Sequence, residues 1–333
     1  MNAKIALITG GFTGEIEISL KSAAFVEQKL CASQYDVYKI ILTQQSWYYV
    51  DEVGIKHEIN RNDFTLSLKN GIVKFDLAFI MIHGSPGEDG KLQGYLDMIG
   101  LKYTSCDTLT SALTMNKAYT KYLLQGIENL YLAPSVCLSP ANRAACEISI
   151  IKDLKLPYFV KPNGGGSSIG MTKVKQIDEL ASALDRAFGT ENAGKQVLVE
   201  EFVAGREFSV GIYNSKEGLK VLPATEVITT REFFDFDAKY IPGLTNEVTP
   251  ADLTVEQQAR MEKLVKEVYI RLNCKGLVRV DFFLERETDK FYFIEINTIP
   301  GQTETSFIPQ QVRAAGLSES DFYVELIEQE LLN

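Results

Sequence analysis

Four polar residues near the end of the chain occupy alternate positions in two otherwise apolar stretches. Arg279 and Asp281 lie in VRVDFF, and Glu295 and Asn297 lie in FIEIN. Because residues two apart in a strand share a face, a hairpin of these stretches would bring all four side chains together. Carboxylate and amide oxygens are the ligands that Mg²⁺ prefers. The pattern therefore predicts a magnesium site on a pair of strands.

The alternative for these strands is a solvated outer face of an antiparallel sheet, which shows the same alternation. The stretch NTIPGQT follows directly, and its Pro300 and Gly301 predict a turn that presents backbone N–H groups beside the metal. This context favours the metal site.

A second chemical signal is the run FVKPNGGGSSIG at 159–170. Its glycines let the backbone approach a ligand closely, and Lys161 ends the preceding strand, where its ammonium group can meet a phosphate. Lys117 lies in a similarly neutral setting, although a single lysine is usually a solvated tip. Carboxylates suited to ribose hydroxyls follow in VLVEEFVAGREFSV, namely Glu200, Glu201 and Glu207.

Two further segments suit small-molecule binding. The turn GGFTGE at 10–15 follows a strand and precedes a helix, as a dinucleotide-binding turn does, but it lacks the GxGxxG spacing, so its role stays open. Residues 229–250 have no convincing period, and a loop that long inside a compact domain is generally functional or disordered.

Hydrophobic periodicity predicts the scaffold that holds these groups. Strand-like runs at 4–9, 36–42 and 76–82 and an amphipathic helix at 17–32 indicate βαβ units and a parallel sheet. Residues 43–75 are polar and irregular and fit a hairpin or meander at the sheet edge.

The later part of the chain changes character. Helical segments at 107–115, 116–127 and 141–154 precede closely spaced strands, which favour antiparallel sheets, and a long helix at 254–273 leads into the two polar strands. The fold class predicted is thus α/β and α+β, in three units: an N-terminal parallel α/β domain at 1–110, a central lobe at 111–205 and a C-terminal lobe at 206–333.

Composition excludes several classes of protein. The chain has 333 residues, 45% of them hydrophobic, and a net charge of −10, so a general nucleic-acid binder is not expected. The five cysteines lack CxxC spacing and the only histidines are His57 and His83, which argues against disulfide staples and His-rich zinc sites. No signal peptide or membrane span is recognisable, so we expect a cytoplasmic protein without membrane contact.

As an ordered series, the motifs resemble those of the D-alanine–D-alanine ligases of the ATP-grasp superfamily. The resemblance runs essentially end to end, through GGFTGEIEISL, IHGSPGEDGKLQGYLDMIG, YTSCDTLTSALTMNK, VKPNGGGSSIGM, VLVEEFVAGREFSV, DAKY, VRVDFF and EINTIPGQT. It implies an N-terminal domain followed by a two-lobed ATP-grasp fold. It also implies ATP and two Mg²⁺ ions, with Mn²⁺ as a substitute, and a homodimer.

The resemblance further implies roles for individual residues. Phosphate contacts would come from Lys117 and Lys161, the glycine-rich lid from Gly166 and Ser168, and the adenosine site from Glu200, Glu201, Val203 and Glu207. The metal ligands would be Asp281, Glu295 and Asn297. The first D-alanine would meet Glu15, Ser167, Tyr240 and His83, the second would meet Lys239, Ser306 and Phe307, and the oxyanion would meet Arg279 and Gly301.

The implied reaction is ATP-dependent ligation of two D-alanines through a D-alanyl phosphate, releasing ADP and phosphate, for peptidoglycan precursor synthesis. The alternatives are a D-alanine:D-lactate ligase and a non-catalytic nucleotide-binding module. Tyr240 favours the dipeptide, because depsipeptide relatives generally carry histidine in that loop, and Arg279 argues against a module that needs no oxyanion donor. Ile16, Ile299 and Phe307 depart from the arginine, serine and leucine common in the family, and Phe307 changes the expected size of the second pocket.

Overall fold

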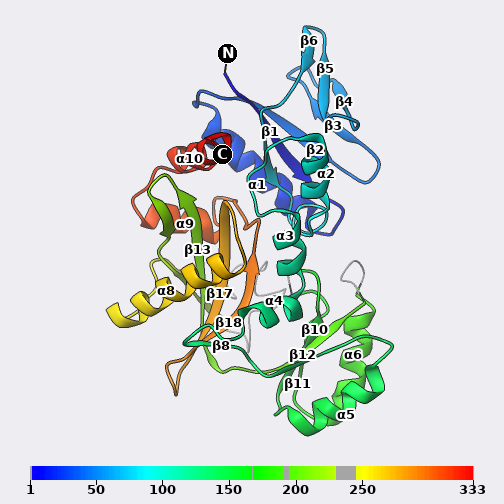
Figure 1. Cartoon of the computed structure of the whole chain (residues 1–333), viewed down its shortest axis with the longest axis vertical. Coiled ribbons are helices and arrows are strands. Elements are labelled where there is room, and N and C mark those ends of the chain that lie inside the picture. The colour runs from blue at the N-terminus through cyan, green and yellow to red at the C-terminus, as the bar shows by residue number, and fades with distance from the viewer. Residues whose placement is uncertain (1, 167, 191–194, 230–244, 333) are drawn as a thin grey trace.

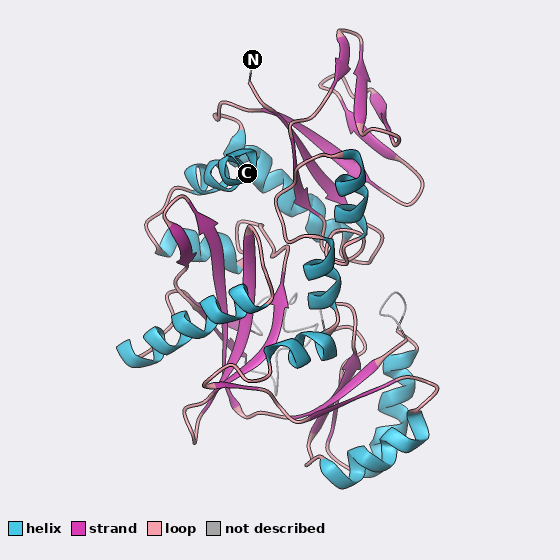
Figure 2. Cartoon of the chain, in the orientation of Figure 1, coloured by secondary structure: helices cyan, strands magenta, loops and turns pink. Residues whose placement is uncertain are grey.

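The computed structural model describes residues 2–166, 168–190, 195–229 and 245–332. Within these residues the chain forms three β-sheets with helices packed around them (Figures 1 and 2). None of the described helices is both long and apolar enough to cross a membrane. One sheet is parallel at its centre and the other two are mainly antiparallel, which confirms the predicted α/β and α+β class.

The first sheet has the strand order β6-β5-β4-β3-β2-β1-β7. Its parallel centre consists of β1 (Lys4–Gly10), β2 (Asp36–Leu42) and β7 (Leu77–Met81), and the helices α1 (Ile16–Leu30) and α2 (Lys91–Ile99) contribute side chains to its core. The predicted edge meander at 43–75 is confirmed as β3 (Trp47–Val50), β4 (Lys56–Asn60), β5 (Thr65–Leu68) and β6 (Gly71–Val73).

Local sequence explains why this sheet presents functional groups at one edge. Strands β1 and β7 are apolar runs that the structure buries almost completely, as expected for strands covered on both faces. Because β1 and β7 are parallel neighbours, the loops that follow them open at the same edge of the sheet. Glu15 lies in the first loop and His83 in the second.

Helices α3 (Thr108–Met115) and α4 (Lys117–Leu124) lead from the first sheet to the second. Asp107 and Asn116 cap them, since their side chains accept hydrogen bonds from the backbone N–H groups of Thr110 and Tyr119. The second sheet has the antiparallel order β11-β10-β12-β9. It consists of β9 (Ser135–Leu138), β10 (Tyr158–Pro162), β11 (Thr172–Val174) and β12 (Val197–Glu201), with α5 (Arg143–Asp153), α6 (Leu180–Phe188) and the 3-10 helix η1 (Ile177–Glu179).

The third sheet has the order β16-β15-β13-β17-β18-β8, and β14 pairs with β13. Its strands are β8 (Leu130–Tyr131), β13 (Gly205–Ser215), β14 (Gly218–Val221), β15 (Thr225–Thr229), β16 (Thr245–Val248), β17 (Leu277–Glu285) and β18 (Phe291–Asn297). Helix α8 (Val255–Arg271) packs on β13 and β14, and helix α9 (Phe307–Ala314) packs on β13.

Two elements pack with a sheet outside their own stretch of sequence. Strand β8 pairs with β18 of the third sheet, although it lies in the predicted central lobe. Helix α10 (Glu319–Leu332) returns to α1, where Phe322 and Tyr323 join the core of the first sheet and Lys29 pairs with Glu319 at 2.6 Å (Figure 1). The domain boundaries at 110 and 205 therefore stay a proposal.

Candidate active site

Residues from all three sheets line one cavity of about 850 Å³. Its walls come from the loops after β1 and β7, the glycine-rich run after β10, strands β17 and β18, and the start of α9. The residues singled out in the sequence that line it are Glu15, His83, Lys117, Lys161, Gly166, Ser168, Glu200, Glu207, Arg279, Asp281, Glu295, Asn297, Gly301, Ser306 and Phe307. Ser167, Lys239 and Tyr240 lie outside the described residues.

The paired strands β17 and β18 place four polar side chains on one face. Arg279 lies opposite Asn297, and Asp281 lies opposite Glu295, so the hairpin expected from the sequence forms. Arg279 holds Asp281 through both carboxylate oxygens, with Nε to Oδ1 at 2.9 Å and Nη2 to Oδ2 at 2.8 Å. Asn297 donates to Asp281 Oδ2 at 3.2 Å, and Ser209 of β13 donates to Oδ1 at 2.6 Å.

This face is electrostatically balanced by cations. Burial would lower the pKa of Arg279, but the Asp281 carboxylate outweighs burial and raises it, so the guanidinium stays charged. Lys117 Nζ lies 3.5 Å from Glu295 Oε2. Each carboxylate therefore has a positive partner in the protein.

The same face fits a hard divalent cation. Its donors are two carboxylates and one amide, and Mg²⁺ favours such oxygen ligands while keeping positions for phosphates and water. Among the described residues no cluster of three or more His, Cys, Asp or Glu could hold a metal. On this face the third oxygen donor beside Asp281 and Glu295 is the amide of Asn297.

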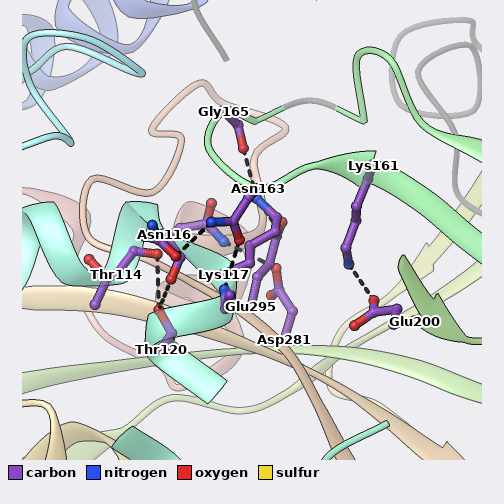
Figure 3. A network of polar contacts seen from close by, with 12 residues as sticks. Thr114, Asn116, Lys117, Thr120, Lys161, Asn163, Gly165, Glu200, Asp281 and Glu295 are labelled. Atoms are coloured by element: carbon purple, nitrogen blue, oxygen red, sulfur yellow. Dashed lines mark hydrogen bonds and ion pairs between the residues drawn. The ribbon is translucent and has the colours of Figure 1, made fainter. Parts of the chain in front are cut away.

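Lys117 also ties the glycine-rich run to this site (Figure 3). Its ammonium group donates to the carbonyl oxygen of Gly165 at 2.7 Å. Asn163, which is buried, anchors the start of the run: its Oδ1 accepts from the N–H of Ala118 at 2.8 Å, and its Nδ2 donates to Asn116 Oδ1 at 2.7 Å. Lys117 and the start of the glycine-rich run, Asn163 and Gly165, are thus held in one hydrogen-bonded unit.

At the other end of the cavity, Glu200 lies between two lysines. Its Oε1 accepts from Lys161 and its Oε2 accepts from Lys121 at 3.0 Å. Burial alone would raise the pKa of Glu200, but the two ammonium groups lower it to about 2. Lys161, expected at a phosphate, is therefore ion-paired with the carboxylate expected at the adenosine.

Aromatic residues accompany the carboxylates of this end. Phe159 pairs with Glu200 across β10 and β12, and Phe283 pairs with Glu207 across β13 and β17. All four line the cavity, and an apolar slot edged by carboxylates suits a nucleoside. Glu201 lies on the opposite face of β12, where its side chain accepts the N–H of Lys155 at 2.8 Å, and neither Glu201 nor Val203 lines the cavity.

Two glycines crowd the side chain of Glu15. Gly84 has φ +70°, and a Cβ there would lie 2.7 Å from Glu15 Oε2. A Cβ on Gly166 would lie 3.2 Å from Glu15 Oε1. The glycine-rich run therefore approaches Glu15 through Gly166, the residue that precedes Ser167 in the sequence.

His83 is committed to protein partners through both ring nitrogens. Nδ1 lies 2.9 Å from the carbonyl oxygen of Ile299, which can only accept, so Nδ1 carries the proton. Nε2 then accepts from the hydroxyl of Ser22 at 3.0 Å, and that oxygen accepts the N–H of Gln302 at 3.2 Å. Burial lowers the pKa of His83, consistent with a neutral ring.

Glu88 holds the other side of the Ile299 peptide. Its Oε1 accepts the N–H of Ile299 at 3.3 Å and its Oε2 accepts the N–H of Gly84 at 2.8 Å. Burial, helped by the charge of Glu15, raises the pKa of Glu88 to about 8. The loop that carries Gly301 is thus fastened to the first sheet by His83 and Glu88.

The expected second-substrate end lies at the start of α9. Ser306 precedes the helix, and its Oγ accepts the N–H of Thr303 at 3.0 Å. The ring of Phe307 lies 5.4 Å from the guanidinium carbon of Arg279. A helix N-terminus beside a guanidinium attracts a carboxylate.

Sequence reasoning missed several residues of the site. Glu88 and Asn163 lie inside motifs quoted for the resemblance, GSPGEDG and VKPNGGG, but they were not singled out. Lys121 and Ser22 carry no signal in the sequence, because only the fold brings them beside Glu200 and His83.

Comparisons with known proteins agree along the whole chain. Family models described as D-ala D-ala ligase N-terminus and C-terminus match residues 4–106 and 136–328. A D-alanine–D-alanine ligase of Parabacteroides distasonis is 43% identical, covering 100% of this chain and 99% of the relative. One of Azobacteroides pseudotrichonymphae is 40% identical, covering 97% of this chain and 98% of the relative.

Solved structures give the same picture. The VanG D-Ala:D-Ser ligase of Enterococcus faecalis superposes with a TM-score of 0.87 at 32% identity, covering 98% of this chain and 99% of that one. The D-alanyl-alanine synthetase A of Vibrio cholerae has a TM-score of 0.87 at 30% identity, covering 100% of this chain and 99% of that one.

Proposed function

The chain belongs to the D-alanine–D-alanine ligase family, with the ATP-grasp fold of that family, and on this premise we propose how its residues join two D-alanines. The reaction is ATP-dependent ligation to D-alanyl-D-alanine, a step of peptidoglycan precursor synthesis. One observation carries the assignment of the site. Arg279, Asp281, Glu295 and Asn297 share a single face, in one cavity with Lys117, Lys161 and Glu15.

In the first half-reaction, the carboxylate of one D-alanine attacks the γ-phosphorus of ATP, and D-alanyl phosphate and ADP form. Lys117 and Lys161 neutralise charge on the transferring phosphoryl group, as phosphoryl transfer requires. Glu15 binds the ammonium group of this D-alanine. The close approach of Gly166 to Glu15, where an added Cβ would lie 3.2 Å from Oε1, supports a lid that excludes water from the acyl phosphate.

In the second half-reaction, the amine of the other D-alanine, after losing a proton, attacks the acyl carbon and phosphate leaves. The tetrahedral intermediate carries an oxyanion, for which the Arg279 guanidinium and the Gly301 N–H are the proposed donors. Ser306, the N-terminus of α9 and Lys239 receive the carboxylate. Ser167 and Tyr240 complete the proposal at the first D-alanine.

Asp281, Glu295 and Asn297 are the proposed ligands of two Mg²⁺ ions, which Mn²⁺ can replace. When bound, such ions neutralise the polyphosphate and its transferring group. The all-oxygen donor set on one strand pair supports this assignment. The side chain of Glu201 faces away from the cavity, so Glu201 and Val203 are proposed to reach the adenosine only through their backbone.

The test is the dependence of phosphate release on substrate and metal. We expect release from ATP only when D-alanine and Mg²⁺ are both present, loss with a chelator, recovery with Mg²⁺ or Mn²⁺, and D-alanyl-D-alanine by mass spectrometry. Mixtures of D-alanine with D-lactate or D-serine test the rival second substrates. ATP binding without any product would leave a nucleotide-binding module instead of an enzyme.

We also propose that the chain works as a homodimer in the cytoplasm, where its substrate ATP is supplied. Three large apolar side chains on successive helices support the dimer: Met98 of α2, Leu109 of α3 and Tyr122 of α4 are 81%, 67% and 63% exposed. Large apolar side chains that are this exposed can be buried when two copies of the chain meet. Light scattering of the wild type and of Leu109→Asp measures the oligomeric state.

A further inference from the structure

Lys121 has no place in the functions assigned above, yet it is the most deeply buried lysine of the nucleotide end. Its ammonium group has three protons and three acceptors: the carbonyl oxygen of Ala133 at 2.7 Å, Ser135 Oγ at 2.9 Å and Glu200 Oε2 at 3.0 Å. It does not line the cavity. Burial lowers its pKa, and the charge of Glu200 opposes that shift.

Glu200 is therefore held by two lysines that differ in their access to ligand. Lys161 contacts Oε1 and lines the cavity, whereas Lys121 contacts Oε2 and does not line the cavity. A nucleotide that enters the cavity can draw Lys161 toward its phosphates, but it cannot reach Lys121. The two oxygens of Glu200 thus have one exchangeable partner and one permanent partner.

Charge balance makes the permanent partner necessary. A buried carboxylate that loses its only cation is strongly destabilised and takes up a proton instead. With Lys121 in place, Glu200 stays ionised and fixed after Lys161 moves, and Oε1 becomes an acceptor on the cavity wall. Its neighbour Phe159 supplies the apolar surface on which a base can lie.

We propose that Lys121 is a positioning residue for nucleotide selection: it fixes Glu200 as a carboxylate whose Oε1 accepts from an amino group of the base. This inference rests on the proposed nucleotide site. An ionised acceptor favours a 6-aminopurine and repels a 6-oxopurine, so Lys121 sets the preference for ATP over inosine triphosphate although it touches neither.

The test compares ATP with inosine triphosphate in the wild type, Lys121→Met and Lys121→Gln. We expect either substitution to raise the KM for ATP about tenfold and to reduce the preference for ATP over inosine triphosphate by a similar factor, the loss typical of a hydrogen bond to a charged group. The KM for D-alanine should change less than about twofold, because that site lies at the other end of the cavity. Lys121→Gln can still donate to Ala133 and Ser135, so it serves if Lys121→Met does not fold.

Ser135→Ala is the matched control, because it removes one partner of Lys121 and keeps the charge. It should retain the wild-type preference. Glu200→Gln should lose the preference, and adding Lys121→Gln to it should change the preference no further. An unchanged ATP preference in a folded Lys121 variant, or an equal loss in Ser135→Ala, overturns the inference.

Failure of the inference can be told from failure of the proposed function. D-alanine-dependent product formation by the wild type tests the ligase assignment. Calorimetric binding of ATP and inosine triphosphate requires no turnover, so it tests Lys121 in either case. Equal ratios of the two dissociation constants in the wild type and Lys121→Gln would refute the positioning role.

Discussion

Glu88 should make the stability of this protein fall as the pH rises. Its pKa is raised from 4.5 to about 8 in the folded chain, first by burial and then by the charge of Glu15. Below pH 4.5 the carboxyl group is protonated in both folded and unfolded chains and contributes no pH dependence. Between pH 4.5 and 8 only the unfolded chain loses the proton, so unfolding becomes more favourable. At about 1.4 kcal/mol for each pH unit, the loss approaches about 5 kcal/mol.

The matched variant is Glu88→Gln, which cannot ionise. At pH 5 it should be about 1 kcal/mol less stable than the wild type, because the amide nitrogen cannot accept the second N–H group, whereas the hydroxyl oxygen of the protonated Glu88 carboxyl still can. Between pH 5 and pH 8 the wild type should lose stability relative to this variant. For a chain of this length, about 5 kcal/mol corresponds to about 7 °C in Tm.

Differential scanning fluorimetry or calorimetry of both proteins across pH 5 to 9 measures this difference, and subtraction removes the titration of the remaining groups. A difference in Tm that stays constant from pH 5 to 8 would show that Glu88 has its ordinary pKa in the folded chain. An opposite slope would show that the N–H groups of Gly84 and Ile299, with Arg279, outweigh burial. Either result refutes the reasoning.

Two further predictions concern clashes and charge at the site. Gly84→Ala should lower kcat/KM about tenfold or more, because its Cβ would lie 2.7 Å from Glu15 Oε2. Gly100→Ala is the control, since Gly100 has the same φ of +70° but nothing within reach of an added Cβ. Equal losses of kcat/KM in the two variants would show that the clash with Glu15 is not the cause. Asp281→Ala and Glu295→Ala should both abolish phosphate release. Asp281→Ala should also lower the free energy of unfolding by about 3–5 kcal/mol, since Arg279 loses its buried partner. Glu295→Ala should lower it by only about 1 kcal/mol. Equal denaturation midpoints for the two variants would contradict this difference.

Periodicity predicts much of the fold and the polar face shared by β17 and β18. Alternation in VRVDFF and FIEIN predicts which side chains of a hairpin share a face, and the register of Asp281 with Glu295 agrees. The apolar runs at β1 and β7 predict a parallel centre, and the polar, irregular sequence at 43–75 predicts a hairpin or meander at the sheet edge. These features depend on residues close together in the sequence, which is where pattern carries information.

The remaining features depend on contacts between distant segments. Lys121 of α4 meets Glu200 of β12, and Ser22 of α1 meets His83 and Gln302. No local pattern distinguishes a buried lysine with three acceptors from a solvated lysine tip. For the same reason, the sequence does not show that the ring nitrogens of His83, which lines the cavity with Glu15, bind Ile299 and Ser22.

Ile299, which departs from the serine expected at this position, helps to fix the loop that carries Gly301. Its side chain is buried in the hydrophobic core that the first sheet shares with residues of the third sheet and the last two helices. Its N–H binds Glu88 and its carbonyl oxygen binds His83. Burying an isoleucine side chain is worth about 1.5–3 kcal/mol, which a serine at this position would not supply. The peptide two residues before Gly301 is thus fixed by an apolar anchor and two hydrogen bonds. Since Glu88 and His83 belong to the first unit of the chain, the two hydrogen bonds that fix the Ile299 peptide form only while that unit is docked against the third sheet.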